Sequence, residues 1–510
     1  MVEVSRTARV IQNAKIALIF YCLILVLQFF SRKVFLDCLG SELLGLNTTA
    51  QTLLQFLNLA ESGIGAAVAF ALYKPLNLGN RQEINEILSV QGWFYRRVGI
   101  AVLFGSVVLM LFFPMIFCKA KIPLIFSFVT YIVFLIGALL SYFINYNIVL
   151  LSADQKEYLI TIPTQGVRVL KVIVQIFVVW ELAHGYVWWL VVEVLSAFIT
   201  SVIMLRVMKH EYPWLKSNIT LGKNIRWKYS FLLTKTKQLF FHKIGGYVLT
   251  QTTPLVIYAF STLTTVAIYG NYWVIVLGCV VFMDALSRGF NASVGNLVAE
   301  GDKSKIKIVF WEILTFKIFL AGGICYGIVC LSESFICLWV GHEYVMDRYA
   351  MIIMTAIYFI HMHRTSDIFL SAYGLFSDIW APIIQSALSL FFSVTLGYFW
   401  GLVGIFIGVL IAQIIIVNTW KVLFLYKRGF NESIREYLIK YTVKIILLCL
   451  VYFLITPVIN VFIFQVSTLF DWIKCAMLYI AFYVVSAGCL FYIFDSSFRS
   501  LVKRFIKDKV

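Results

Sequence analysis

Long apolar runs separated by short polar connections follow one another along the whole chain. A membrane-spanning helix needs about 20 mostly apolar residues, and about 14 segments of this kind occur. The predicted spans are 13–36, 43–72, 92–117, 124–151, 159–180, 186–208, 230–260, 266–297, 307–331, 349–372, 380–400, 402–426, 438–463 and 472–494. The longest connection, residues 209–229, leaves no room for a soluble domain. The pattern predicts an all-α polytopic membrane protein.

The composition agrees with this pattern. The chain has 510 residues, of which 61% are hydrophobic and 13% are charged. Soluble domains have about 25% charged residues, so the apolar surplus here must face lipid. This excludes a cytosolic enzyme, a secreted domain and a nucleic-acid-binding protein. The first apolar run follows Arg6, Arg9 and Lys15 without a small-residue cleavage site, so it is predicted to be a retained helix rather than a signal peptide.

The net charge of +17 has an uneven distribution along the chain. Lysines and arginines favour alternate connections by roughly four to one, and positively charged connections stay in the cytoplasm. The bias predicts that both termini and the basic connector 209–229 are cytoplasmic.

Short sequence matches at similar spacing indicate an internal repeat. Three pairs of segments occupy the same place in the order of the spans: Leu151–Ala153 with Leu370–Ala372, Ile162–Pro163 with Ala381–Pro382, and Asn80–Arg81 with Asp302–Lys303. The repeat predicts a six-helix lobe over 1–208, the connector 209–229, a second six-helix lobe over 230–428, and two extra helices with a basic tail over 429–510. Transporters with such parallel repeats bind substrate between their halves.

Several cations lie inside the predicted spans. A cation in mid-membrane costs about 2.5–3.5 kcal/mol on insertion scales, so it usually faces water or a partner. Arg168 and Lys171, at i and i+3, share a helix face. Few acids oppose these cations, which favours an anionic substrate. The candidate substrate-binding cations are Arg32, Arg168, Lys171, Lys243, Arg288 and Arg364. Arg96, Arg97, Lys317 and Lys444 are instead expected to lie near helix ends and extend to the interface.

Candidate residues for coupling to H⁺ or Na⁺ are fewer. They are Glu61, Asp284, His363 and Asp367. Glu61 is a lone acid among small residues, suited to an ion site or to a bond with a neighbouring helix. Asp284 with Arg288 and Arg364 with Asp367 are alternatively structural salt bridges within a helix, and the histidines are alternatively packing residues. The sequence has no P-loop, no catalytic motif and no cysteine pattern of a metal site, so neither an enzyme nor a cofactor is predicted.

Within residues 39–75, the segments Leu39–Asn47, Leu59–Gly65 and Leu72–Pro75 resemble the Wzx-type O-antigen and polysaccharide flippases of the multidrug/oligosaccharidyl-lipid/polysaccharide (MOP) superfamily. The resemblance implies two lobes in a V-shaped, MATE-like arrangement, with the last two helices next to the lipid tail. It also implies a multi-pass protein of the bacterial inner membrane that serves lipopolysaccharide or capsule assembly. Such a protein moves an undecaprenyl-diphosphate-linked oligosaccharide to the periplasmic leaflet, driven by an ion gradient, and works beside a polymerase and other glycan-assembly proteins.

Two other functions are considered. A MATE-like multidrug/ion antiporter usually has fewer helices and more cavity acids than this chain. A membrane-embedded glycan polymerase or ligase usually has a large periplasmic loop, whereas the longest connector here is predicted to be cytoplasmic. A purely scaffolding protein would not explain the cations within the spans.

Overall fold

The computed structural model describes residues 6–58, 61, 63–234, 236, 252–375, 378, 380–462 and 466–507. Within this part of the chain the structure is helical and contains no β-strand. Nine of the described helices are long and apolar enough to cross a membrane. The predicted all-α polytopic fold is confirmed.

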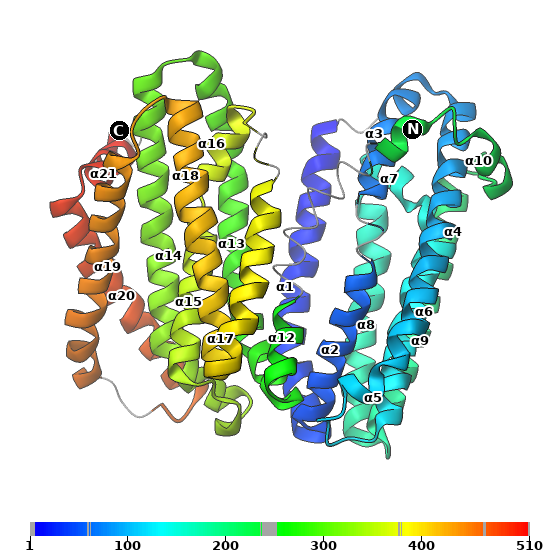
Figure 1. The fold of residues 1–510 in the computed structure, drawn as a ribbon, viewed down its shortest axis with the longest axis horizontal. Helices are drawn as coiled ribbons and strands as arrows, with labels where there is room; N and C mark the ends of the chain where they lie inside the picture. Colours follow the sequence, from blue (N-terminus) through cyan, green and yellow to red (C-terminus); the bar gives the residue numbers. More distant parts are fainter. Residues whose placement is uncertain are drawn as a thin grey trace. The chain divides into compact units, whose positions relative to one another are not determined.

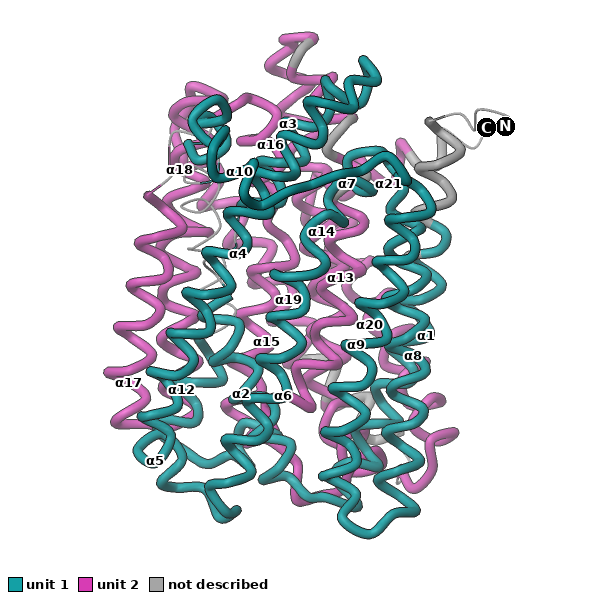
Figure 2. The backbone as a smooth tube through the Cα atoms, turned by 90° about the vertical axis from the view of Figure 1, so that its right-hand side faces the viewer, with its two compact units in different colours: residues 1–267 teal, residues 268–510 magenta. Residues whose placement is uncertain are grey.

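The chain divides into two compact units, residues 1–267 and 268–510 (Figure 2). The helices of unit 1 are α1 (Arg6–Leu39), α2 (Ser41–Asn58), α3 (Ile64–Leu78), α4 (Arg81–Leu111), α5 (Phe113–Ile116), α6 (Leu124–Phe143), α7 (Val149–Ala153), α8 (Tyr158–Glu181), α9 (Gly185–Glu211), α10 (Ile219–Ile225) and α12 (Thr253–Phe260) (Figure 1). Unit 2 begins within α13 (Leu263–Glu300). It continues with α14 (Lys303–Trp339), α15 (Arg348–Met362), α16 (Ser366–Ala372), α17 (Trp380–Gln413), α18 (Lys421–Leu425), α19 (Arg435–Phe462), α20 (Leu469–Phe494) and α21 (Ser496–Lys507). The finer division predicted from the repeat stays a prediction.

Some predicted spans are interrupted helices. The span 43–72 is divided between α2 and α3, where Gly63 adopts a φ of 106° that favours glycine. The span 349–372 is divided between α15 and α16 by residues 363–365. Most of the span 230–260 lies outside the described residues, and α12 forms its end. These interruptions place polar side chains within otherwise apolar segments.

A tight turn at Gly401 separates two helical arms within α17. Gly401 has φ 55° and ψ −133°, a conformation that a residue with a side chain rarely adopts. Across the turn, the Ser393 hydroxyl of the first arm donates to the Ile405 carbonyl of the second arm at 2.9 Å. A Cβ added at Gly404 would lie 2.0 Å from the Leu396 carbonyl oxygen, so only glycine fits there. The turn separates the predicted spans 380–400 and 402–426 as the sequence indicates.

The matched segments of the predicted repeat end in the same backbone motif. In unit 1, α7 ends with hydrogen bonds from the Lys156 amide to the Leu151 carbonyl and from the Gln155 amide to the Ser152 carbonyl. In unit 2, the bonds from Leu375 to Leu370 and from Gly374 to Ser371 repeat this arrangement after α16. Gln155 and Gly374 have φ values of 60° and 67°. Both units therefore contain the same left-handed cap after Leu-Ser-Ala.

The starts of two other helices are also alike. The Asn80 side chain accepts a hydrogen bond from the Glu83 amide at the start of α4. The Asp302 side chain accepts from the amides of Ser304 and Lys305 at the start of α14. These are N-caps at the two positions that the sequence repeat pairs.

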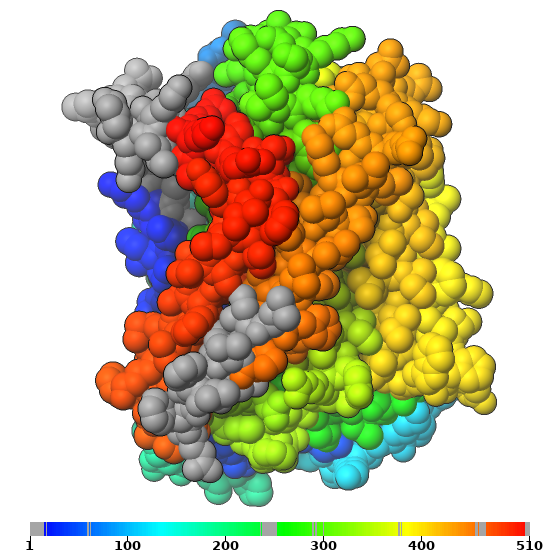
Figure 3. All heavy atoms as spheres, turned by 90° about the vertical axis from the view of Figure 1, so that its left-hand side faces the viewer, coloured from blue at the N-terminus to red at the C-terminus, as the bar shows by residue number. Residues whose placement is uncertain are grey.

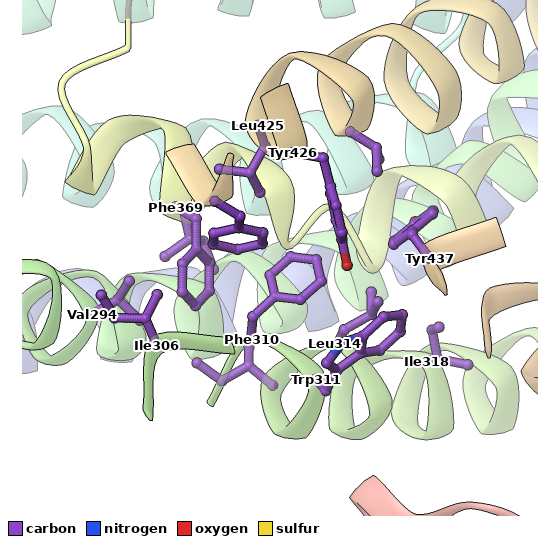
Figure 4. Packing of buried hydrophobic residues seen from close by; sticks show 14 of the residues in the cluster. Val294, Ile306, Phe310, Trp311, Leu314, Ile318, Phe369, Leu425, Tyr426 and Tyr437 are labelled. Carbon is purple, nitrogen blue, oxygen red and sulfur yellow. The ribbon is translucent and has the colours of Figure 1, made fainter. Parts of the chain in front are cut away.

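An aromatic core holds part of unit 2 together (Figure 4). The ring of Phe310 on α14 lies 5.2 Å from that of Phe369 on α16 and 6.1 Å from that of Tyr426, measured between centroids. The ring of Trp311 lies 5.8 Å from that of Tyr437 on α19. The core joins α14, α16, α19 and the end of α18, so it fixes the backbone that carries Asp367 and Lys421.

The C-terminal helices α19 and α20 lie side by side on one face of unit 2 (Figure 3). Asp495, between α20 and α21, accepts a hydrogen bond from the Ser497 amide at 2.8 Å and forms an ion pair with Lys444 of α19. The side chains of Lys444 and Asp495 are 2% and 5% exposed. The expectation that Lys444 extends to the interface is wrong, because a carboxylate neutralises it inside the unit.

We expect this ion pair to stabilise the C-terminal part of unit 2. The substitution Lys444→Met leaves a buried carboxylate without a partner, which should lower the free energy of unfolding by about 3–5 kcal/mol. In the double variant Lys444→Met/Asp495→Asn no charge is unpaired and the amide oxygen still caps α21, so most of the stability should return. Thermal unfolding in detergent, followed by intrinsic fluorescence, measures both changes.

The control is Lys440→Met. The pair of Lys440 with Glu436 is 40% and 35% exposed, so its loss should change the free energy of unfolding by less than about 1 kcal/mol. Equal destabilisation of the single and double Lys444 variants would contradict the assignment.

Candidate functional site

A polar stripe runs along one side of α8 in unit 1. Thr164, Arg168, Lys171 and Gln175 are spaced four, three and four residues apart, which places them on one face of the helix. On the opposite side, Ile173 and Phe177 are 49% and 62% exposed. Phe177 follows Arg168 by nine residues, about half a turn away around the helix. Because the apolar side suits lipid, the polar stripe marks the side of α8 that is turned away from lipid.

The lower part of the stripe is bound to α9. The Lys171 ammonium lies 2.8 Å from Glu193 Oε1, and the Gln175 amide donates to Glu193 Oε2 at 2.9 Å. Lys171 and Glu193 are 20% and 19% exposed. Their pairing offsets the charge of Lys171 and joins α8 to α9.

Arg168 differs from its neighbour in the stripe. Its side chain is exposed, and within the described residues it forms no ion pair. A guanidinium has five N–H donors in a planar fork that matches a phosphate or carboxylate. Arg168 is therefore available to an anionic ligand, whereas Lys171 is partly neutralised.

Arg32 and Glu61, two further predicted site residues of unit 1, are bound within the unit. The Arg32 guanidinium donates to the Ala267 carbonyl at 3.0 Å. Glu61 lies in the interruption between α2 and α3, where its Oε1 accepts a hydrogen bond from the Tyr95 hydroxyl at 2.8 Å. Nearby, the Tyr142 hydroxyl donates to Asn58 Oδ1 at 2.9 Å. The interruption therefore contains a polar network that links α2 to α4 and α6.

Unit 2 has a charged centre at the interruption between α15 and α16. The Asp367 carboxylate forms ion pairs with the Arg364 guanidinium at 3.2 Å and with the Lys421 ammonium at 2.7 Å. The Lys317 ammonium donates to the Arg364 carbonyl at 3.3 Å. The exposed Asp284 acts electrostatically on Lys317 without a direct bond. Two of these three cations bind the single carboxylate of Asp367 and the third binds a backbone carbonyl, so the centre has an excess of positive charge.

A chain of hydrogen bonds connects this centre to two other helical segments. His363 Nδ1 lies 2.6 Å from the Phe359 carbonyl oxygen, and its Nε2 lies 3.1 Å from the Tyr441 hydroxyl. The Tyr441 oxygen in turn accepts from the Asn418 amide at 2.9 Å. A carbonyl only accepts, so Nδ1 carries the proton and Nε2 accepts from Tyr441. This pattern fits a neutral imidazole with its proton on Nδ1.

The structure brings some of the predicted residues together. It unites His363, Arg364 and Asp367 in unit 2 and keeps Arg168 beside Lys171 in unit 1. Lys243 lies outside the described residues, and so does the side chain of Arg288. The described residues contain no group of three or more His, Cys, Asp or Glu side chains that would hold a metal.

Two cations of the unit 2 centre, Lys317 and Lys421, are not among the predicted site residues. Lys317 is 2% exposed near the middle of the 37-residue α14, so the expectation that it extends from a helix end is wrong. Lys421 is not a predicted site residue, and it binds Asp367. The position of Lys317 within a long helix was a usable signal. The partner of Lys421 lies 54 residues away and has no local signal.

Comparison with known structures shows the fold. The lipid II flippase MurJ in an inward closed conformation matches with a TM-score of 0.68 and 14% identity, covering 96% of this chain and all of that one. A multidrug resistance MATE family transporter of the MOP superfamily, inward-facing, matches with a TM-score of 0.60 and 13% identity over 79% of this chain and 94% of that one. A Vibrio cholerae MATE transporter matches with a TM-score of 0.51 and 14% identity over 83% and 97%.

This chain has the MurJ and MATE fold. No protein-family model matches the sequence, and no curated protein matches it. At these identities the structural likeness concerns the fold alone. It agrees with the all-α polytopic fold that the sequence predicts.

Arg168 and Lys171 provide a matched pair for a test of the stripe. We expect Arg168→Gln to weaken the binding of an anionic lipid at least about ten-fold with little change in stability, because no carboxylate among the described residues pairs with Arg168. Lys171→Met should instead lower the unfolding temperature, because Glu193 loses its cation. Binding of undecaprenyl diphosphate, followed by native mass spectrometry, and thermal unfolding in detergent measure the two effects. Unchanged binding by Arg168→Gln would exclude this arginine from the site.

Proposed function

We propose that this chain is a flippase for an undecaprenyl-diphosphate-linked oligosaccharide, such as an O-antigen, capsule or exopolysaccharide repeat unit. It moves this lipid from the cytoplasmic to the periplasmic leaflet of the bacterial inner membrane by alternating access. The observation that carries the proposal is the match to a lipid II flippase over 96% of the chain. The two MATE matches above cover 79% and 83%. The share of this chain that the lipid II flippase covers is thus larger than the share that the MATE transporters cover. The residues after 428 make up a part of the chain about as large as the difference between these shares.

The charges support a phosphorylated substrate. A diphosphate carries negative charge that guanidinium and ammonium groups bind by charge-assisted hydrogen bonds. Arg168 has the most available charge, so we assign it the first contact. Lys171 and Arg364 contribute after exchange with their carboxylate partners. Arg32, Lys243 and Arg288 complete the proposed cationic set.

An apolar groove in unit 2 supports a lipid substrate. The groove has a volume of about 530 Å³ and lies among α14, α15, α19 and α20. Tyr326, Phe359, Leu448, Phe453 and Tyr483 are among its lining residues. A polyprenyl chain is hydrocarbon, so burying it there is favourable in the same way as burying an apolar side chain. We propose that this groove borders the lipid tail.

Net transport of the lipid toward one leaflet against its concentration difference needs a driving force. We propose coupling to H⁺ or Na⁺ through Glu61, Asp284, His363 and Asp367. The hydrogen-bonded chain from His363 to Asn418 supports H⁺, because protonation of Nε2 would break the bond it accepts from Tyr441. The bond would then have to reverse, which links protonation to the position of α19. A polymerase and other glycan-assembly proteins are proposed partners, and both termini are proposed to be cytoplasmic.

The direct test uses purified protein in proteoliposomes with a lipid-linked oligosaccharide that has a fluorescent label on its glycan. A membrane-impermeant quencher added outside reports the label that has crossed. We expect the protein to accelerate the loss of fluorescence, and an imposed pH or sodium gradient to change the rate. Arg348→Gln, at the exposed start of α15, is the control variant and should transport normally.

A MATE-like multidrug/ion antiporter is the second candidate, because the MATE fold is also matched. It predicts ion-coupled uptake of a lipophilic cation such as ethidium into the same vesicles and no crossing of the labelled lipid. That result would replace the flippase proposal.

A further inference from the structure

A second cationic hollow lies in unit 1, apart from the stripe on α8. It has a volume of about 630 Å³ and is formed by α4 and by the segment that follows α10. Trp93 and Arg97 of α4 line it together with Arg226, Trp227 and Ser230. Arg97 belongs to a predicted apolar span and Arg226 to the basic connector, so the sequence gives no sign that the two arginines lie close together.

The connector holds Arg226 in place beside α4. The Asn218 amide donates to the Ser89 hydroxyl at 2.9 Å, and the Lys216 amide donates to Asn85 Oδ1 at 2.7 Å. A Cβ added at Gly222 would lie 2.0 Å from the Ser89 carbonyl oxygen, so the two backbones touch there. Arg226 follows this contact by four residues, which fixes its position relative to Arg97.

Both guanidinium groups lie against the same indole ring. The Cζ atoms of Arg97 and Arg226 are 5.2 Å and 5.1 Å from the centroid of the Trp93 ring, and Arg226 Cζ is also 4.9 Å from that of Trp227. These are cation–π distances. The two positive charges therefore lie within about 10 Å of each other, since both are about 5 Å from one ring.

Nearby carboxylates are bound to other groups. The Glu86 carboxylate pairs with the Lys228 ammonium at 2.5 Å and accepts a hydrogen bond from the Tyr229 hydroxyl at 2.8 Å. Glu61 accepts a hydrogen bond from the Tyr95 hydroxyl. Among the described residues, Arg97 and Arg226 form no ion pair, and the Lys223 carbonyl takes only one Arg226 donor. Two like charges are thus held together in a hollow with most of their donors unused.

We propose that this hollow binds a phosphate group carried by a membrane lipid. Two guanidinium forks supply paired donors for phosphate oxygens, and the indole walls supply apolar surface for the adjoining part of the lipid. A lipid-linked diphosphate and an anionic phospholipid of the same leaflet share this chemistry. The site is separate from the Arg168 stripe, and it does not depend on the flippase proposal.

The test measures lipid binding to the full chain in detergent by native mass spectrometry. The probes are undecaprenyl diphosphate, phosphatidylglycerol and undecaprenol, which has no phosphate. We expect Arg97→Gln/Arg226→Gln to weaken the binding of at least one phosphate-bearing lipid by roughly ten-fold or more, because charge-assisted hydrogen bonds are lost. Undecaprenol binding should not change. If the double variant loses only the binding of undecaprenyl diphosphate, the ligand of the hollow is the lipid-linked diphosphate. If it loses only the binding of phosphatidylglycerol, the ligand is a phospholipid of the surrounding membrane.

Arg96→Gln is the matched control, because Arg96 is an exposed arginine of α4 that does not line the hollow. Unchanged binding of both phosphate lipids by the double variant, or an equal loss in Arg96→Gln, would overturn the proposal. Arg97→Lys/Arg226→Lys keeps the charge without the fork and should lose part of the affinity while retaining the wild-type unfolding temperature. If the wild type binds these lipids through Arg97 and Arg226 but transports no lipid-linked oligosaccharide, the flippase proposal fails and the site stands.

Discussion

The cost of placing a cation in a membrane governs the arrangement of this protein. Such a cation needs a carboxylate, a carbonyl, water or a ligand. Lys444 satisfies this need with Asp495, and Lys171 with Glu193. Lys317 donates a hydrogen bond to the backbone carbonyl of Arg364. Arg168 forms no ion pair in the described structure, which separates a cation available to a ligand from cations that hold helices together.

The interrupted helices follow from the same constraint. Backbone groups that leave a helix inside a membrane need partners from protein or water, so interruptions occur where they are shielded from lipid. Around Gly63, the interruption brings Glu61 to Tyr95. Between α15 and α16, it brings Asp367 to Lys421 and His363 to Tyr441. In both units the break places a titratable group against another helix, where a change in protonation would alter helix contacts.

The sequence predicted the helices well because length and apolar content decide a membrane span. The repeat stays a prediction, although the two Leu-Ser-Ala segments that it pairs end in the same left-handed cap. The sequence separated the two arms of α17 at Gly401. It did not identify the breaks, because single residues such as Gly63 interrupt runs that remain apolar overall.

The charged residues of the site were predicted only in part, because many of their partners lie far away in the sequence. Arg364 and Asp367 are three residues apart, so their pairing is local in the sequence, although Arg364 lies in the break before α16. The partners of Lys421 and Lys444 are 54 and 51 residues distant. Tertiary packing decides such pairs, and a count of cations within spans cannot separate neutralised charges from available ones.

We propose that the Arg168 side of α8 faces water while its Phe177 side faces lipid. The most direct measurement replaces each residue from 162 to 177 by cysteine, one at a time, in a cysteine-free background and records labelling by a membrane-impermeant thiol reagent. We expect labelling at 164 and 168, protection at 173 and 177, and slower labelling at 168 when the lipid-linked oligosaccharide is present. Uniform protection along α8, or labelling at 173 and 177 instead, would contradict it.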